Sequence, residues 1–290
     1  MTPPAVPFPS PDTGSAPAAD PPPDADRARA PATRLRIAEW PRVSREYSAA
    51  LLSGDLVDRW PEGDGHPVLV LPGFLAGESS TRYLRRVLQR LGYAAYDWEL
   101  GRNLGVRRGM EDAFDRTVRR LADEHGRRVS LIGWSAGGIY AREIARRLPD
   151  STRMVITLGS PFRGNHRATH AWRLYSLVNR GPALEEAMSE AARRAREQPL
   201  PVPTTCVYSR NDGIVAWECC TSLPAPMTEN VEVNSSHLGY GYNLETLYVI
   251  ADRLAVPEGE WTPLEEGPAR RRRGFGARRG DDVGDGGTLR

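Results

Sequence analysis

The chain has 290 residues, with 39 basic and 37 acidic side chains and a formal net charge of +2. This near-neutral balance gives no general reason to expect a nucleic-acid or acidic partner. The length suits one large α/β domain whose apolar residues can fill a core without metal or disulfide staples. The sequence shows no membrane-span-length apolar run and no secretory signal pattern, so we expect a cytoplasmic protein.

The cysteines and histidines predict neither a disulfide framework nor a metal site. Three cysteines give an odd count, and two of them, Cys219 and Cys220, are adjacent. The five histidines are scattered and no C-x-x-C spacing occurs, so no metal or other cofactor is expected. Every basic residue is arginine, which indicates a coding bias rather than selection for guanidinium chemistry.

Both ends of the sequence have low complexity. Residues 1–33 are rich in Pro, Ala and Asp and almost free of large apolar side chains, which predicts disorder. Residues 267–290 form an Arg/Gly-rich tail, also predicted to be disordered. Its four consecutive arginines at 270–273 allow weak contact with an anionic membrane surface, although a solvated tail is the simpler interpretation. We therefore expect one domain over residues 34–266.

Between the tails, apolar runs alternate with amphipathic stretches. This pattern predicts a mostly parallel central sheet with helices on both faces. Ahead of the first strand, residues 35–60 form an irregular apolar lead-in that we expect to pack on the domain. Strands are predicted at residues 67–71, 93–100, 128–134, 154–158, 204–208 and 231–233. Helices are predicted at residues 80–91, 110–124, 139–148 and 244–254, with Gly126 ending the second of them.

An insertion between the fourth and fifth predicted strands favours a small helical cap at about residues 163–200. Two helices are predicted there, at 167–179 and 184–197. The first places Trp172, Tyr175 and Val178 on one face. That apolar face suggests a hydrophobic substrate, although aromatic residues at helical spacing more often belong to a core.

The most informative motif is G-W-S-A-G at residues 133–137, which lies between a predicted strand and a predicted helix. This context is typical of a nucleophile elbow, in which Ser135 occupies a sharp, strained turn. Gly133 and Gly137 provide the small side chains that such a close approach requires. The competing interpretation is a glycine-rich turn with a serine helix cap.

A serine nucleophile needs a base and an orienting acid further along the chain. His237 follows the last predicted strand and precedes the closing helix, which makes it the strongest candidate for the base. His166 and His170, in the predicted cap, remain competitors. Asp212 follows the fifth strand and is the candidate acid, with Glu218 as the fallback. Asp212 also fits an Asn-Asp-Gly turn, and His237 a surface loop.

An acyl-transfer site also needs hydrogen-bond donors for an oxyanion. The first expected donor is the backbone N–H of Ala136, directly after the serine. The second is the N–H of Phe74, in the L-P-G-F-L-A-G loop after the first strand. There Gly73 lets the backbone approach, while Pro72 stiffens the loop.

These residues together resemble the α/β-hydrolases of the lipase/esterase type, in particular the bacterial branch related to triacylglycerol lipases and inositol deacylases. The resemblance covers about residues 65–254. It implies an α/β-hydrolase fold, with Ser135, Asp212 and His237 as the triad and Phe74 and Ala136 as oxyanion donors. It is based on the segments V-L-V-L-P-G-F, L-I-G-W-S-A-G-G, I-T-L-G-S-P-F-R-G, Y-S-R-N-D-G-I-V and N-S-S-H-L-G-Y.

Two positions depart from the family pattern. Pro72 stands where many relatives have histidine, which bears on the second oxyanion donor. Trp134 stands where many lipases have histidine or tyrosine, which suggests a different pocket floor.

The sequence therefore predicts a serine hydrolase that cleaves a carboxylic ester, small or lipid-like, without a cofactor. An acyltransferase that uses the same triad remains an alternative, because the two differ only in water exclusion and acceptor binding. A non-catalytic binding protein with a hydrolase fold is the alternative from another class. The sequence leaves the physiological substrate and the oligomeric state open.

Overall fold

The structure is a computed structural model that describes residues 23–105, 107, 109–164, 168–170, 175, 176, 178, 179 and 189–264. The predicted C-terminal tail, residues 1–22 of the predicted N-terminal tail and residues 167, 171–174 and 177 of the first predicted cap helix lie outside these residues. A short 3-10 helix, η1 (Ala25–Arg27), precedes the predicted start of the domain. Its Ala25 is buried against Ala168, Ala216 and Cys219.

The centre of the fold is a six-stranded sheet in which all neighbouring strands are parallel, in the order β2-β1-β3-β4-β5-β6. Because β1 lies between β2 and β3, the chain first extends the sheet in one direction and then in the other. In open parallel sheets, sites form at the carboxyl ends of the strands where this reversal occurs. The strands are β1 (Pro67–Leu71), β2 (Ala94–Asp97), β3 (Val129–Trp134), β4 (Thr152–Leu158), β5 (Thr204–Tyr208) and β6 (Thr228–Glu232).

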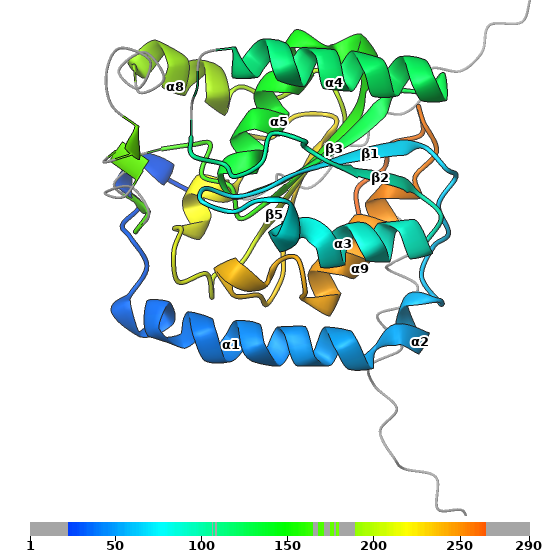
Figure 1. Ribbon diagram of the computed structural model, residues 1–290. Helices are drawn as coiled ribbons and strands as arrows, with labels where there is room; N and C mark the ends of the chain where they lie inside the picture. Colours follow the sequence, from blue (N-terminus) through cyan, green and yellow to red (C-terminus); the bar gives the residue numbers. More distant parts are fainter. Residues whose placement is uncertain are drawn as a thin grey trace, which may run out of the picture.

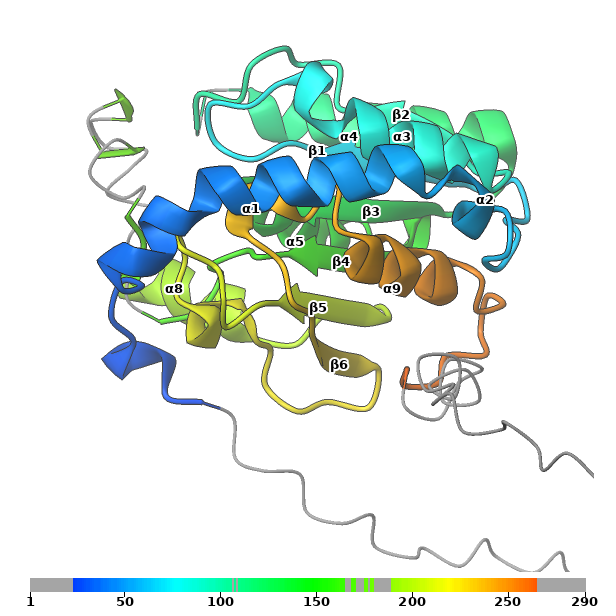
Figure 2. The same ribbon diagram turned by 90° about the horizontal axis from the view of Figure 1, so that it is seen from below.

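Helices cover both faces of the sheet, as a buried parallel sheet requires (Figures 1 and 2). Along β1, Val68 and Val70 point into one core, while Leu69 and Leu71 point into the other. The first core lies under α3 (Glu78–Arg90) and α9 (Leu244–Leu254), and the second under α4 (Met110–His125) and α5 (Ala136–Arg147). The predicted α/β class, with helices on both faces, is confirmed.

The helix boundaries follow local signals in the sequence. Gly126 adopts a left-handed conformation (φ 58°) directly after α4 and ends that helix, as predicted. The second predicted cap helix is present in shorter form as α8 (Glu190–Glu197), which begins at the N-cap Ser189. Within the described ranges, no helix combines the length and apolarity needed to cross a membrane.

The lead-in before β1 is a regular helix, so the prediction of an irregular segment was wrong. It forms α1 (Thr33–Leu52), followed by the short α2 (Gly54–Val57). Helix α1 is inverted relative to an ordinary surface helix: it buries Glu39 and Glu46, while Ile37 and Trp40 are each 70% exposed. The large apolar residues Ile37 and Trp40 therefore do not lie on the face of α1 that contacts the rest of the protein. Figures 1 and 2 show α1 outside the layer of α3 and α9.

A polar cluster of buried side chains around the exposed Asp64 lies at the amino ends of the strands. His66 precedes β1, is fully buried, and bonds through Nδ1 to Asp64 at 2.5 Å and through Nε2 to the Ser130 hydroxyl at 2.8 Å. Arg153 donates to Asp64 at 2.9 Å. Burial lowers the pKa of His66 to about 4, against the opposing effect of the Asp64 hydrogen bond. The cluster therefore contains a neutral imidazole at neutral pH.

The folded protein should lose stability as the pH falls from about 6.5 towards 4, because the unfolded chain protonates His66 more readily than the folded chain does. A shift of this size corresponds to about 3 kcal/mol of unfolding free energy. Urea unfolding at several pH values measures this slope. In His66→Gln the His66 contribution to the slope should disappear, while His125→Gln, at a partly exposed position, serves as the matched control. Equal slopes for the wild type and His66→Gln would contradict the prediction.

Candidate active site

Ser135 occupies a strained turn between β3 and α5. Its backbone dihedrals are φ 53° and ψ −120°, a left-handed conformation that residues with a Cβ rarely adopt. The glycines around it explain why the turn can form. A Cβ on Gly133 would lie 2.3 Å from the Gly138 Cα, and one on Gly137 would lie 2.3 Å from the Leu71 carbonyl oxygen. The elbow is therefore possible only without side chains at these positions.

The structure brings Ser135, His237 and Asp212 together at the carboxyl ends of β3, β6 and β5. His237 Nε2 lies 3.1 Å from the Ser135 hydroxyl oxygen, and Nδ1 lies 2.6 Å from Asp212 Oδ2. The other Asp212 oxygen accepts the N–H groups of Ile214 and Val215, each at 2.8 Å. Asp212 and His237 are only 2% and 5% exposed, whereas Ser135 is partly exposed. The arrangement matches a hydrogen-bonded nucleophile, base and orienting acid.

The surroundings of His237 favour its charged form. Burial alone would lower the pKa of His237, but the charge and hydrogen bond of Asp212 outweigh it, with a further contribution from Glu39. The pKa of His237 is therefore raised above its ordinary value of 6.5. An imidazole with such a pKa can accept a proton from a serine hydroxyl and hold it.

The loop after β1 lies next to Ser135. A Cβ on Gly73 would lie 3.4 Å from the Ser135 Cβ. The N–H of Leu75 bonds to the Asn103 carbonyl at 2.7 Å, and the Asn103 amide donates to the Pro72 carbonyl at 2.9 Å. These bonds fix the loop, while no acceptor within the described residues takes the N–H of Phe74.

The N–H of Ala136 is the first of α5, so no carbonyl of that helix can accept it. Within the described part of the chain, neither the N–H of Phe74 nor that of Ala136 has a backbone acceptor.

Of the two competing histidines, His170 bonds to the Pro31 carbonyl at 2.9 Å, and His166 lies outside the described residues. His125, at the end of α4, bonds to the Tyr96 hydroxyl at 2.8 Å. The fallback acid Glu218 lies in η4 (Trp217–Cys220), whereas the bond to His237 comes from Asp212.

The cluster of Ser130, His66 and Asp64 reproduces the same chain of atoms at the opposite edge of the sheet. Both Ser130 and His66 are fully buried, so no substrate reaches them. The two Ser-His-Asp arrangements have the same hydrogen bonds. They differ in the serine, which is buried at Ser130 and partly exposed at Ser135. Across the described part of the chain, no group of three His, Cys, Asp or Glu side chains is placed to hold a metal ion.

Two residues that position the base were not identified from the sequence. The Trp134 indole is buried and donates to the His237 carbonyl at 3.0 Å, so its side chain supports the base loop, where the sequence suggested a pocket floor. Glu39, from α1, accepts the N–H of His237 at 2.9 Å. The seven-residue spacing of Glu39 and Glu46 was an available signal, because it places both carboxylates on one helix face.

An aromatic contact is made by the loop after β1. The rings of Phe74 and Tyr175 pack edge to face with centroids 5.0 Å apart, which brings part of the predicted cap to this loop. Trp172 lies outside the described residues, and Val178 is 44% exposed.

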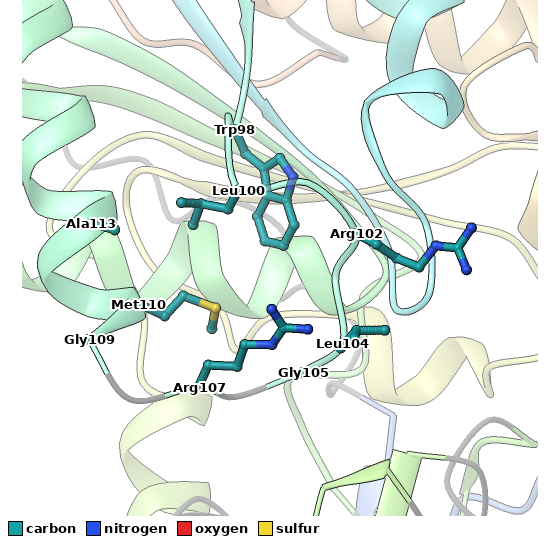
Figure 3. Close-up of a pocket in the computed structure, with 9 residues that line it drawn as sticks. All are labelled: Trp98, Leu100, Arg102, Leu104, Gly105, Arg107, Gly109, Met110 and Ala113. Carbon is teal, nitrogen blue, oxygen red and sulfur yellow. The ribbon is translucent and has the colours of Figure 1, made fainter.

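A cavity of about 200 Å³ lies between the end of β2 and the start of α4 (Figure 3). Its lining includes Trp98, Leu100, Leu104 and Met110, with Arg102 and Arg107 as charged members.

Comparison with known proteins supports the fold. No protein-family model matches the sequence, and no curated protein matches it. Among solved structures, lipase B of Aspergillus fumigatus is similar at 16% identity with a TM-score of 0.52, over 71% of this chain and 56% of the fungal one. This chain thus spans little more than half the length of that lipase. The mature lipase BlEst2 of Bacillus licheniformis is similar at 17% identity with a TM-score of 0.51, over 68% and 94% of the two chains. The chain has their fold, the α/β-hydrolase fold.

Replacing Gly137 by alanine should destabilise the fold, because the new methyl group meets the backbone of β1, which cannot move away cheaply. We expect the free energy of unfolding to fall by about 2 to 4 kcal/mol, measured by urea denaturation. The matched control is Gly54→Ala, whose methyl group meets only the flexible end of Arg90. Equal stability of Gly137→Ala and the wild type would refute the close-approach explanation of the elbow.

Proposed function

We propose that this α/β-hydrolase-fold chain is a serine hydrolase that cleaves carboxylic esters through an acyl-enzyme. The observation that carries the proposal is the hydrogen-bonded chain from Ser135 through His237 to Asp212, built on a strained turn at the sheet's reversal point. All three members are present and in contact, which favours an enzyme over a non-catalytic binding protein of the same fold. Two solved structures that share the fold are lipases, which also favours ester hydrolysis.

In the acylation step, Ser135 attacks the ester carbonyl while His237 Nε2 takes the hydroxyl proton. A C–O bond forms and the carbonyl π electrons move to the oxygen, which the N–H groups of Phe74 and Ala136 stabilise. Asp212 stabilises the imidazolium through the bond to Nδ1. The intermediate collapses, the ester C–O bond breaks, and His237 returns its proton to the departing alcohol.

In the deacylation step, the same groups act on water. His237 takes a proton from a water molecule, whose oxygen attacks the acyl carbonyl of the Ser135 ester. The second tetrahedral intermediate uses the same two N–H donors. Its collapse releases a carboxylic acid and returns the proton from His237 to the Ser135 oxygen, which regenerates the enzyme.

The substrate of this proposal carries an apolar acyl group. Phe74 would place its N–H at the oxyanion while its ring packs on Tyr175. Aromatic side chains beside the reacting carbonyl favour a substrate with an apolar acyl group over one with a charged acyl group.

A fluorophosphonate probe tests the nucleophile directly, because it reacts only with an activated serine. Wild-type protein should be labelled, whereas Ser135→Ala should not be labelled and His237→Ala should be labelled about a thousandfold more slowly. Ser160→Ala is the matched control, since Ser160 is a fully buried serine that bonds to the Gly133 carbonyl. Absence of labelling in the wild type, or equal labelling of Ser135→Ala, would sink the proposal.

The pH profile of ester hydrolysis tests the role of His237. Only the neutral imidazole accepts the serine proton, so kcat/KM should fall as the pH drops through the pKa of His237. Because that pKa is raised, the acid limb should have its midpoint above 6.5. Stopped assays with nitrophenyl esters of increasing chain length measure the midpoint and the acyl preference together. A midpoint below 6.5 would contradict the raised pKa.

Product analysis with added alcohols separates hydrolysis from transfer to an acceptor.

A further inference from the structure

Helix α1 contacts the candidate site through charged side chains on one face. Glu39 is only 2% exposed, and its two oxygens accept three backbone N–H groups. Oε1 accepts from Gly213 at 2.7 Å and from His237 at 2.9 Å, and Oε2 accepts from Leu238 at 3.0 Å. Gly213 directly follows the candidate acid Asp212. One carboxylate therefore joins the turn that carries the acid to the loop that carries the base.

Two further residues on the same helix face add bonds to these loops: Arg42 reaches both of them, and Glu46 reaches the base loop. Arg42 bonds to the Asn211 carbonyl and to the Asn234 side chain, the latter at 3.3 Å. Glu46 accepts the N–H of Ser236 at 2.9 Å and its hydroxyl at 2.5 Å. Residues 39, 42 and 46 follow helical spacing, so one face of α1 holds both loops.

We propose that Glu39 is a positioning residue of the hydrolase, which holds the acid turn and the base loop in register so that Asp212, His237 and Ser135 stay within hydrogen-bond distance. This inference rests on the proposed function. The bond between His237 and Asp212 joins two loops that follow the adjacent strands β5 and β6. These loops also bond to each other, through Ser209 and Ser235 at 2.7 Å and through Asn211 and Asn234 at 3.0 Å, but none of these bonds reaches the backbone of His237. Glu39 binds the peptide N–H of His237 itself and that of the residue after Asp212, so it restrains both ends of this bond. A displacement of about 1 Å can lower a rate about a hundredfold.

Glu39 also acts on the charge of the base. The charged and titratable groups that face His237 are Asp212 from the turn after β5, Tyr240 from the end of η5 (His237–Gly239), and Glu39 from α1. Of these, Asp212 and Glu39 favour the imidazolium that forms when Ser135 loses its proton. Glu46 contacts the neighbouring Ser236 instead. Glu39 therefore contributes both geometry and charge from a helix that begins about 200 residues before His237 in the sequence.

The three N–H donors around Glu39 require a side chain with two acceptor oxygens at this distance. An amide in place of the carboxylate has only one acceptor oxygen, so its NH₂ group would face at least one of the three N–H donors. A shorter aspartate would keep the charge but withdraw the oxygens from all three donors. Glu39→Gln and Glu39→Asp thus separate the two contributions.

Steady-state ester hydrolysis of these variants tests the proposal. In Glu39→Gln we expect kcat to fall about tenfold or more, KM to stay within about twofold, and the acid limb of kcat/KM to move to lower pH. In Glu39→Asp we expect a comparable fall in kcat with an acid limb close to that of the wild type. Arg45→Gln, at an exposed position of the same helix, is the control and should match the wild type.

A purely structural role for Glu39 predicts a different result. The melting temperature of Glu39→Gln would fall, while kcat at a temperature where the variant is folded, and the acid limb, would equal those of the wild type. That result would overturn the proposal.

An NMR titration of the His237 ring provides a readout that needs no turnover. His237 should titrate at a lower pH in Glu39→Gln than in the wild type. A wild type that neither reacts with fluorophosphonate nor hydrolyses esters would end the proposed function, whereas an unchanged His237 titration in Glu39→Gln would end the role of Glu39.

Discussion

The close approach of three backbone segments at Gly133 and Gly137 is the constraint on which the site depends. With no side chains at these positions, the end of β3, the start of α5 and the end of β1 meet at distances that any Cβ would prevent. The turn between them must then take up the strained conformation seen at Ser135, which is stable only because the two packed cores surround it. The same contact places the loop after β1, with Phe74, beside the serine.

Two groups from other parts of the chain hold the backbone of the base. Trp134, one residue before the serine, donates its indole N–H to the His237 carbonyl, and Glu39 accepts the His237 N–H from the opposite side. The peptide unit of the base is thereby anchored through its donor and its acceptor. The contrast with His66 is instructive, because that histidine has a serine and an aspartate of its own but is sealed within the fold. Hydrogen bonding is thus necessary for such a site, and access to solvent decides which arrangement can act.

The strands, the helices that cover them and the three residues that meet at the candidate site could be predicted because each leaves a local signal. Buried parallel strands read as short apolar runs, and G-x-S-x-G between strand and helix marks the elbow. Helix α1 could not be recognised in this way, because it turns Glu39 and Glu46 inward and Trp40 outward, against the usual rule. Which backbone groups those carboxylates satisfy depends on the folded arrangement of loops near residues 212 and 237, which no local pattern contains. The hydrogen bond of the Trp134 indole could not be predicted for the same reason, because its partner, the His237 carbonyl, lies about 100 residues away in the sequence.

The attachment of α1 has a consequence for how the protein fails when it is heated. The buried residues of this helix are Glu39, Glu46 and Ala50, and none of them belongs to the two main cores of the sheet. Detaching α1 therefore breaks these polar bonds and the edge-to-face contacts of Tyr47 with Tyr83 and Tyr242 but leaves the two cores assembled, so it requires less free energy than unfolding the whole domain. Such an opening removes the bonds of Glu39 and Glu46 to the base loop while the sheet remains intact. Inactivation should therefore set in below the melting temperature of the domain, and the thermal limit of the site is set by one helix rather than by the core.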